Sequence, residues 1–153
     1  MRWLELKVPP LLQVLLVAGG MWAIAREWPA AAVPDAIRHG LAALLGLAGI
    51  ACSVAGKIAF GRAGTTVNPL APERASALVT GGIYRYTRNP MYLGFLLVLL
   101  GWAAWLGNPW TLIGPVVFVL YMNRFQIGPE ERALAALFGE EYPAYRAAVR
   151  RWI

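Results

Sequence analysis

Two long apolar runs dominate this sequence and limit what it can fold into. The first covers residues 9–25, with Gln13 as its only strongly polar side chain, and the second covers residues 40–60, with a single charge at Lys57 near its end. A helix needs about 20 mostly apolar residues to cross the hydrocarbon core of a bilayer. Charged residues make up only 14% of the chain, against about 25% in a typical soluble domain. The sequence therefore predicts an integral membrane protein.

Two shorter apolar runs follow, at residues 91–106 and 109–121. Only Gly107 and Asn108 separate them, and Pro109 suits the first turn of a returning helix. The pair is therefore expected to form a tight helical hairpin. With the two longer runs, this gives an all-α integral membrane fold of four transmembrane helices, although tilted or partly re-entrant helices are alternatives for the shorter pair.

The basic residues of the connecting segments predict an orientation. Counted with Lys57 at the end of the second run, the connection between the second and third runs carries five Lys and Arg residues against one Glu, whereas the charges of the first connection cancel. Because cytoplasmic loops carry an excess of Lys and Arg, the second connection and both termini are expected in the cytoplasm, and the protein is expected in a bacterial inner membrane. The net charge of +6 then reflects orientation and anionic lipid, and no nucleic-acid partner is expected.

Most familiar kinds of site are missing from the sequence. Cys52 is the only cysteine and lies within an apolar run among small residues that favour close helix packing. The single histidine, His39, lies at a predicted membrane boundary and is expected to be an interfacial residue. There is no P-loop, no metal-ligand spacing and no plausible Ser/His/Asp set, so no metal site is expected.

Two polar clusters remain as candidates for chemistry. One occupies residues 85–89, just before the third run, and the other comprises Arg124, Glu130 and Glu131 after the fourth. The hairpin would bring them together, and arginines, carboxylates and helix N-termini at a lipid boundary can hold a zwitterionic cofactor. The alternative is an interfacial belt of Tyr and Arg, and the residues alone do not decide between the two.

The polar segments also predict short helices. Pro72 can begin one that runs to Leu78 and ends before Gly81. Pro129 is expected to restart a helix, which Gly139 stops. The C-terminal segment then carries an apolar face and is expected to form an amphipathic helix on the cytoplasmic membrane surface. The residues of that face are Tyr142, Tyr145, Val149 and Trp152.

Three stretches of this sequence carry a family resemblance. Residues 82–94, GIYRYTRNPMYLG, resemble the isoprenylcysteine carboxyl methyltransferase family motif G-x-Y-x-x-x-R-H-P-x-Y-x-G. Residues 130–134 and 138–146 resemble that family's E-E-x-x-L and F-G-E-E-Y-x-x-Y segments. The family's histidine is Asn89 here, and the sequence Asn-Pro-Met-Tyr resembles the related phospholipid N-methyltransferases. The resemblance covers roughly residues 64–153 and leaves the substrate open.

The resemblance implies an integral-membrane methyltransferase that uses S-adenosylmethionine and releases S-adenosylhomocysteine. We expect one domain over residues 1–153, with its cofactor site at about residues 82–134. The implied reaction is carboxyl O-methylation of a lipid-like or isoprenylated acceptor that enters from the bilayer. The alternatives are N-methylation of a phosphatidylethanolamine-type phospholipid, methylation of a small thiol and, without catalysis, a membrane scaffold or small-solute carrier.

Carried onto this sequence, the resemblance gives each candidate residue a role. Asn89, Arg124 and Glu131 are the candidate catalytic residues, and Arg85 and Arg124 are candidates for binding an acidic or phosphate-bearing substrate. The residues expected to line the cofactor pocket are Tyr84, Arg88, Asn89, Pro90, Tyr92, Gly94, Glu130, Glu131 and Leu134.

Overall fold

The computed structural model describes residues 4–28, 31, 33–64, 70–72 and 75–153. Within these ranges every regular element is a helix, which confirms the all-α prediction. The elements in chain order are α1 (Pro10–Glu27), α2 (Asp35–Arg62), η2 (Gly82–Arg85), α3 (Pro90–Leu106), η3 (Pro109–Leu112), α4 (Ile113–Tyr121), η4 (Met122–Ile127), α5 (Gly128–Phe138) and α6 (Glu141–Ala148).

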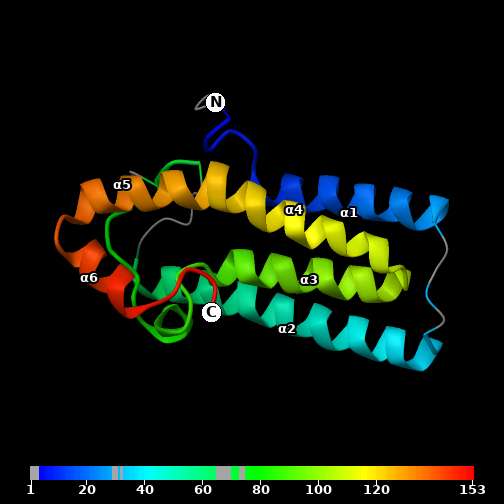
Figure 1. The fold of residues 1–153 in the computed structure, drawn as a ribbon. Helices are drawn as coiled ribbons and strands as arrows, with labels where there is room; N and C mark the ends of the chain where they lie inside the picture. The colour runs from blue at the N-terminus through cyan, green and yellow to red at the C-terminus, as the bar shows by residue number, and fades with distance from the viewer. Residues whose placement is uncertain (1–3, 29–30, 32, 65–69, 73–74) are drawn as a thin grey trace.

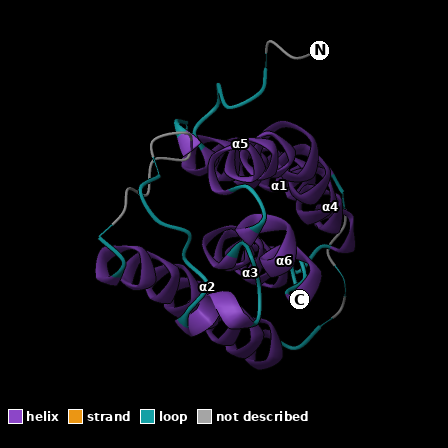
Figure 2. Cartoon of the chain, turned by 90° about the vertical axis from the view of Figure 1, so that its left-hand side faces the viewer, coloured by secondary structure: helices purple, strands orange, loops and turns teal. Residues whose placement is uncertain are grey.

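The long helices form a bundle with α3 at its centre. Viewed along the bundle, α2 lies on one side of α3, and α1 and α4 lie on the other (Figure 2). The buried core forms where α1, α3 and α4 meet, around Met21, Leu99, Phe118 and Met122, whose side chains are fully buried. In the view of Figure 1, the connections between α1 and α2 and between α3 and α4 lie at the right-hand end. The left-hand end holds the connection between α2 and α3, together with helices α5 and α6.

Among the described helices, α2 alone is long and apolar enough to cross a bilayer by length and composition, and α3 is apolar but has 17 residues. The prediction of four spans therefore stays a prediction. Large apolar side chains on several helices nevertheless face outward, including Leu15, Leu44 and Leu120, which are each 61–65% exposed. Apolar surface of this extent suits contact with lipid.

The close packing of α2 on α3 depends on small residues, as the spacing of the second run predicts. A methyl group on Gly49 would lie 2.5 Å from the carbonyl oxygen of Gly94, so neither position has room for a larger side chain. Ser53 Oγ donates to the Met91 carbonyl and Cys52 Sγ to the Pro90 carbonyl, each at 3.2 Å. Cys52 is thus a packing residue at this interface, and α2 holds the first turn of α3 in place.

The predicted hairpin between the third and fourth runs is confirmed. Gly107 ends α3 in the left-handed region, with φ of +64°, where glycine is the favoured residue. The Asn108 side chain then accepts from the Trp110 N–H at 3.0 Å and caps the returning helix, which Pro109 opens. The first connection lies at the same end, because the Ala31 N–H donates to the Gly107 carbonyl at 2.8 Å.

The expected restart of a helix at Pro129 is wrong, because the helix never stops. The chain runs through α4, the π-helical segment η4 and α5 without a break (Figure 1). Pro129 has no N–H to donate to the carbonyl four residues earlier, that of Phe125. The wider π turn accommodates this defect, and the Phe125 carbonyl accepts instead from the Leu6 N–H at 3.0 Å. The N-terminal segment therefore braces the helix at its weakest turn.

Two further predictions of short helices need correction. The expected helix from Pro72 to Leu78 does not form, because residues 75–80 are irregular; residues 73–74 lie outside the described residues. The C-terminal amphipathic helix is only eight residues long, Glu141–Ala148, and the chain beyond it is extended. The Tyr142 side chain, expected at a membrane surface, is buried in the protein. Hydrogen bonds to the segment before α3 draw this tail back onto the bundle.

Candidate active site

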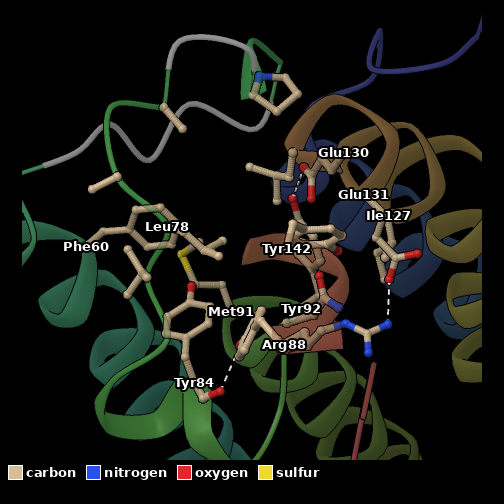
Figure 3. Close-up of a pocket in the computed structure, with 17 residues that line it drawn as sticks. Phe60, Leu78, Tyr84, Arg88, Met91, Tyr92, Ile127, Glu130, Glu131 and Tyr142 are labelled. Carbon is tan, nitrogen blue, oxygen red and sulfur yellow. Dashed lines mark hydrogen bonds and ion pairs between the residues drawn. The ribbon is translucent and has the colours of Figure 1, made fainter. Parts of the chain in front are cut away.

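A cavity of about 110 Å³ lies between the start of α3 and the start of α5. Residues from α2, the connection to α3, η4, α5 and α6 surround it (Figure 3). The lining residues are Phe60, Pro72, Ala75, Ala77, Leu78, Val79, Tyr84, Arg88, Asn89, Met91, Tyr92, Ile127, Glu130, Glu131, Leu134, Tyr142 and Tyr145. Part of each polar cluster of the sequence therefore lies here, Arg88 and Asn89 from the first and Glu130 and Glu131 from the second, as the hairpin predicts.

Glu131 is held between two arginines on one wall of the cavity. One carboxylate oxygen accepts from Arg88 Nη2 at 2.7 Å and Arg151 Nε at 3.0 Å, and the other accepts from Arg151 Nη2 at 2.5 Å. The Arg88 and Glu131 side chains are only 8% and 9% exposed. Burial alone would raise the pKa of Glu131, but the hydrogen bonds from Arg151 and Arg88 hold it below its usual value. This carboxylate therefore stays charged and fixed.

Glu130, the preceding residue, has different surroundings. Its Oε1 accepts from the Tyr92 hydroxyl and from Gln126 Nε2, each at 2.5 Å, and no described cation forms an ion pair with it. Burial raises the pKa of Glu130 to about 7, against the opposing effect of these hydrogen bonds, and the neighbouring charge of Glu131 adds to the rise. A carboxyl group of this kind can take up or release a proton near neutral pH.

The segment before α3 is tied to the C-terminal tail. The Arg88 N–H donates to the Arg150 carbonyl at 3.0 Å, and Arg88 Nη1 donates to the Val149 carbonyl at 2.5 Å. Asn89 Nδ2 donates to the Arg151 carbonyl at 2.9 Å, and Thr87 Oγ1 donates to the same oxygen at 3.3 Å. These bonds set the position of Arg88 and Asn89 at the cavity wall.

Aromatic side chains form another wall of the cavity. The rings of Phe60 and Tyr84 pack edge to face, with centroids 5.5 Å apart (Figure 3). The Tyr145 hydroxyl donates to the Tyr84 carbonyl at 2.7 Å. Burial raises the pKa of Tyr142 to about 12 and raises the pKa of Tyr84 and Tyr145 as well. All three phenols therefore stay neutral, and their rings offer electron-rich faces to a cationic ligand.

Most of the residues expected to line the cofactor pocket do line this cavity. They are Tyr84, Arg88, Asn89, Tyr92, Glu130, Glu131 and Leu134. Pro90 and Gly94 do not contribute to the lining. Pro90 is buried at the first turn of α3 and Gly94 packs against α2, so both position the helix that carries Tyr92.

The two arginines expected to bind substrate lie outside the lining. Arg85 is exposed on η2, and Arg124 is about half exposed on η4. Arg124 Nη1 pairs with Glu5 at 2.9 Å, and Arg132 pairs with the other oxygen of that carboxylate. Arg124 therefore braces the N-terminal segment against the π turn, and the structure does not bring it together with Asn89 and Glu131.

Sequence reasoning missed Arg151, Gln126, Tyr142 and Tyr145 as members of the site. Gln126 precedes Glu130 by four residues, a helical spacing that could have indicated their contact. The two tyrosines belong to the motif of the tail, but their spacing suggests a membrane-facing helix equally well. No signal in the sequence marks Arg151, because its contact with Glu131 depends on the return of the chain after α6.

The lining fits a small zwitterionic cofactor that also carries a positive centre. Arg88 Nε is a buried donor without a partner among the described residues. Asn89 Oδ1 is an acceptor that receives no hydrogen bond from the described chain. Together with Glu130 and the aromatic wall, the cavity offers a donor for a carboxylate and acceptors for an ammonium or sulfonium group.

Comparisons with known proteins indicate a family of methyltransferases. A family model described as phospholipid methyltransferase matches residues 37–141. The protein-S-isoprenylcysteine O-methyltransferase of Schizosaccharomyces pombe is 40% identical over 75 residues, which are 47% of this chain and 30% of that protein. A probable protein-S-isoprenylcysteine O-methyltransferase of Oryza sativa subsp. indica is 37% identical over 95 residues, 60% of this chain and 48% of that protein.

An uncharacterized protein of Haemophilus influenzae is 49% identical over 63 residues, which are 41% of this chain and the whole of that protein. The chain spans less than half the length of the two isoprenylcysteine relatives described above. No solved structure matches it. Because the family model covers more than half of the chain, the resemblance drawn from residues 82–94 and 130–146 is confirmed. This chain belongs to the phospholipid methyltransferase family.

Proposed function

We propose that this chain is an S-adenosylmethionine-dependent membrane methyltransferase that modifies the head group of a lipid-like acceptor. The observation that supports it best is the cavity at the start of α3. A carboxylate held by two arginines, a carboxyl group with only uncharged described partners, and aromatic rings meet there. The bound cofactor would supply a methyl group already activated by its sulfonium. The protein then has to bind, orient and exclude water.

Arg88, Asn89 and Glu131 are the residues that would hold the cofactor. Arg88 Nε can donate to a carboxylate, and Asn89 Oδ1 can accept from an amino group. Glu131 adds a negative charge, and the arginine contacts fix its position. Binding of S-adenosylhomocysteine, measured by calorimetry in detergent, separates this function from a scaffold or solute carrier, neither of which would bind it.

The proposed membrane layout has four spans within a single domain, with the cavity at the cytoplasmic end. It is supported by the outward-facing apolar side chains and by the ends at which the connections lie (Figure 1). Single cysteines at Ala31 and Ala71, in a Cys52→Ser background, should react with an impermeant thiol reagent from opposite sides of the membrane. Reaction of both from the same side would refute the layout.

The acceptor is proposed to reach the cavity from the bilayer. Phe60, Leu78, Val79, Met91 and Leu134 make much of the lining apolar, and α2, which carries Phe60, is the described helix best suited to cross a membrane. A lipid tail could therefore stay in the hydrocarbon while its head group meets the cofactor. A long-chain acceptor should turn over faster than its tail-truncated analogue in bilayers, and equal turnover would argue against lateral entry.

Among acceptor chemistries, the geometry supports an amine best. An ammonium group must lose its proton before it can attack, and Glu130, with a pKa near 7 and no ion pair to a described cation, can accept that proton. Among the described residues of the lining, Arg88 is the only basic one, and its Nη1 and Nη2 groups already bond to Glu131 and two carbonyl groups, which leaves Nε alone for the cofactor. This favours N-methylation of a phosphatidylethanolamine-type lipid.

The second candidate is carboxyl O-methylation of an isoprenylated acceptor. It is supported by the names of relatives in Schizosaccharomyces pombe and Oryza sativa, and a carboxylate nucleophile needs no base. Labelled S-adenosylmethionine should be supplied with phosphatidylethanolamine and, separately, with an S-farnesylated cysteine analogue. Label in the first product supports the amine, label in the second supports the carboxylate, and label in neither overturns both acceptors.

A further inference from the structure

The C-terminal tail contains an arginine, Arg151, that contacts both Glu131 on α5 and the segment before α3. Through its guanidinium, Arg151 makes two hydrogen bonds to Glu131, at 2.5 and 3.0 Å. Through its backbone carbonyl, the same residue accepts from Asn89 Nδ2 and from Thr87 Oγ1. Neither the family resemblance nor the matched residues 37–141 include Arg151 in a site.

We propose that Arg151 is a positioning residue, which orients the Glu131 carboxylate and the Asn89 amide for the cofactor. The proposal rests on the proposed function. It extends the proposed function in two ways. It names the residue that orients the cofactor-binding groups, and it predicts how cofactor affinity depends on pH when that residue is changed.

Arg151 fixes the orientation of the Glu131 carboxylate. A guanidinium that binds a carboxylate through two N–H groups fixes both the distance and the plane of the carboxylate. Arg88 adds one bond to the same group through Nη2, and two backbone carbonyls accept from its Nη1. Without Arg151, one Glu131 oxygen would lose its only described partner, and the carboxylate could rotate about its remaining bond to Arg88.

Arg151 also fixes the orientation of the Asn89 side-chain amide. A backbone carbonyl can only accept, so the Arg151 oxygen forces the amide to turn its NH₂ group toward the tail. The amide oxygen then remains available as an acceptor. The Trp152 indole and the Arg151 guanidinium also donate to the Asn123 side chain, at 3.1 and 3.4 Å, which anchors the tail to η4. The tail thus sets which atom of Asn89 a ligand meets.

Arg151→Gln removes the charge and the two-point contact but keeps the backbone carbonyl. The charged and titratable groups around Glu131 are then Arg88 from the segment before α3, Glu130 from its own helix and Tyr142 from α6. With one cation lost, the pKa of Glu131 rises toward its ordinary range or above it. Protonation would then weaken cofactor binding at moderately acidic pH in the variant, whereas in the wild type it would not.

The matched control is Arg150→Gln. It removes the same charge one residue earlier, from an exposed side chain that makes no contact with Glu131. Arg151→Lys is the conservative variant, because it keeps the charge but loses the planar, two-point contact. The set separates the effect of net charge from the effect of position.

The experiment measures S-adenosylhomocysteine affinity between pH 5 and pH 8 in nanodiscs. Relative to wild type, we expect Arg151→Gln to lose about tenfold in affinity at pH 7 and to lose more as the pH falls toward 5, by up to about tenfold per pH unit once the pH is below the raised pKa of Glu131. Wild type and Arg150→Gln should share one pH profile, because Glu130 titrates in both, and Arg151→Lys should lie between wild type and Arg151→Gln. A loss in Arg151→Gln that does not depend on pH, or a wild-type affinity in this variant, would overturn the positioning role.

A measurement without ligand keeps this proposal distinct from the proposed function. Infrared difference spectra with ¹³C-labelled glutamate, referenced to Glu131→Gln, follow the carboxyl band of Glu131 directly. We expect its protonation midpoint to lie higher in Arg151→Gln than in wild type. An unchanged midpoint would reject the role of Arg151 even if the wild type binds cofactor. A shifted midpoint in a protein that binds no S-adenosylhomocysteine would support the contact but refute the proposed function.

Discussion

Glu130 and Glu131 are neighbours in sequence but have opposite surroundings in the folded protein. Glu131 receives three hydrogen bonds from two arginines and is almost fully buried. Among the described residues, Glu130 receives hydrogen bonds only from the uncharged Tyr92 and Gln126, and both glutamates line the cavity. Successive residues of a helix point about 100° apart, so one turn of α5 presents one carboxyl group to the two arginines and the other to Tyr92 and Gln126.

This difference gives two neighbouring glutamates different acid–base properties. The pKa of Glu131 is held below its usual value by its arginine partners, whereas burial raises the pKa of Glu130 to about 7. One glutamate is suited to hold a ligand by a permanent charge, and the other is suited to exchange a proton. The following substitutions and pH profiles should show whether the two glutamates differ in their chemistry or are equivalent.

The largest effect is expected for Glu131→Gln. Removal of one partner of a buried ion pair leaves Arg88 without its counter-charge and should destabilise the protein by about 3 kcal/mol. Cofactor affinity should fall by about 1.5–3 kcal/mol, because a charged hydrogen-bond acceptor is lost. Thermal unfolding in detergent and S-adenosylhomocysteine calorimetry measure the two effects. Glu141→Gln, on the exposed start of α6, is the control, and equal behaviour of the two variants would remove Glu131 from the cofactor wall.

The second effect concerns turnover in Glu130→Gln. If Glu130 accepts the proton of an amine, this variant should lose about 10²-fold or more in the rate of N-methylation. Its thermal stability should change little, because glutamine keeps the shape and Glu130 is already close to half protonated at pH 7. A full N-methylation rate in a folded variant would show that Glu130 is not the base.

The third effect is the dependence of the N-methylation rate and of protein stability on pH. N-methylation by the wild type should rise with pH and reach half of its maximum near pH 7, because only the ionised form of Glu130 accepts a proton. Stability should respond in the opposite direction. The folded protein holds a proton on Glu130 that the unfolded chain has lost, so the contribution of Glu130 to stability is greatest below about pH 4.5 and falls as the pH rises to about 7.

The behaviour of Glu131 has the reverse sign, because its pKa is lowered in the folded state. Its contribution to stability is present above its unfolded pKa and is lost as the pH falls. Rate profiles and thermal melts of Glu130→Gln and wild type between pH 5 and pH 8 provide the check. Identical profiles for the two proteins would contradict the assignment of the raised pKa to Glu130.

The smallest effect is expected for Tyr92→Phe. The Tyr92 hydroxyl donates to Glu130 at 2.5 Å and stabilises its ionised form, and Gln126 remains as a second donor. The midpoint of the N-methylation profile should therefore move upward by less than about one pH unit, with little change in the maximum rate. A downward movement would mean that Tyr92 does not stabilise the carboxylate.

Much of the fold follows from the sequence because local signals specify it. The apolar runs give the long helices, the Gly107-Asn108-Pro109 sequence gives the hairpin, and small residues such as Gly49 and Gly94 give the close approach of α2 and α3. The continuity of α4 into α5 could not be predicted in this way. A proline usually ends a helix, and the carbonyl that accepts from Leu6 lies more than a hundred residues away in sequence.

The candidate site shows the same division. The motif residues Arg88, Asn89 and Glu131 meet because the hairpin returns the chain to the same end of the bundle. Arg124 was assigned to the substrate because of its charge and position, but Glu5, from the opposite end of the chain, pairs with it outside the cavity. Contacts such as this depend on how the termini pack, and periodicity does not encode them.

The most direct test of the account is to locate the cofactor. Ultraviolet irradiation of radiolabelled S-adenosylmethionine with the protein in nanodiscs, followed by peptide mapping, identifies the residues beside the bound molecule. The account predicts label on peptides that contain residues 84–92 or 130–145, and loss of this label when S-adenosylhomocysteine is in excess. Label confined to α1 or to the hairpin between α3 and α4, or label that S-adenosylhomocysteine does not displace, would contradict it.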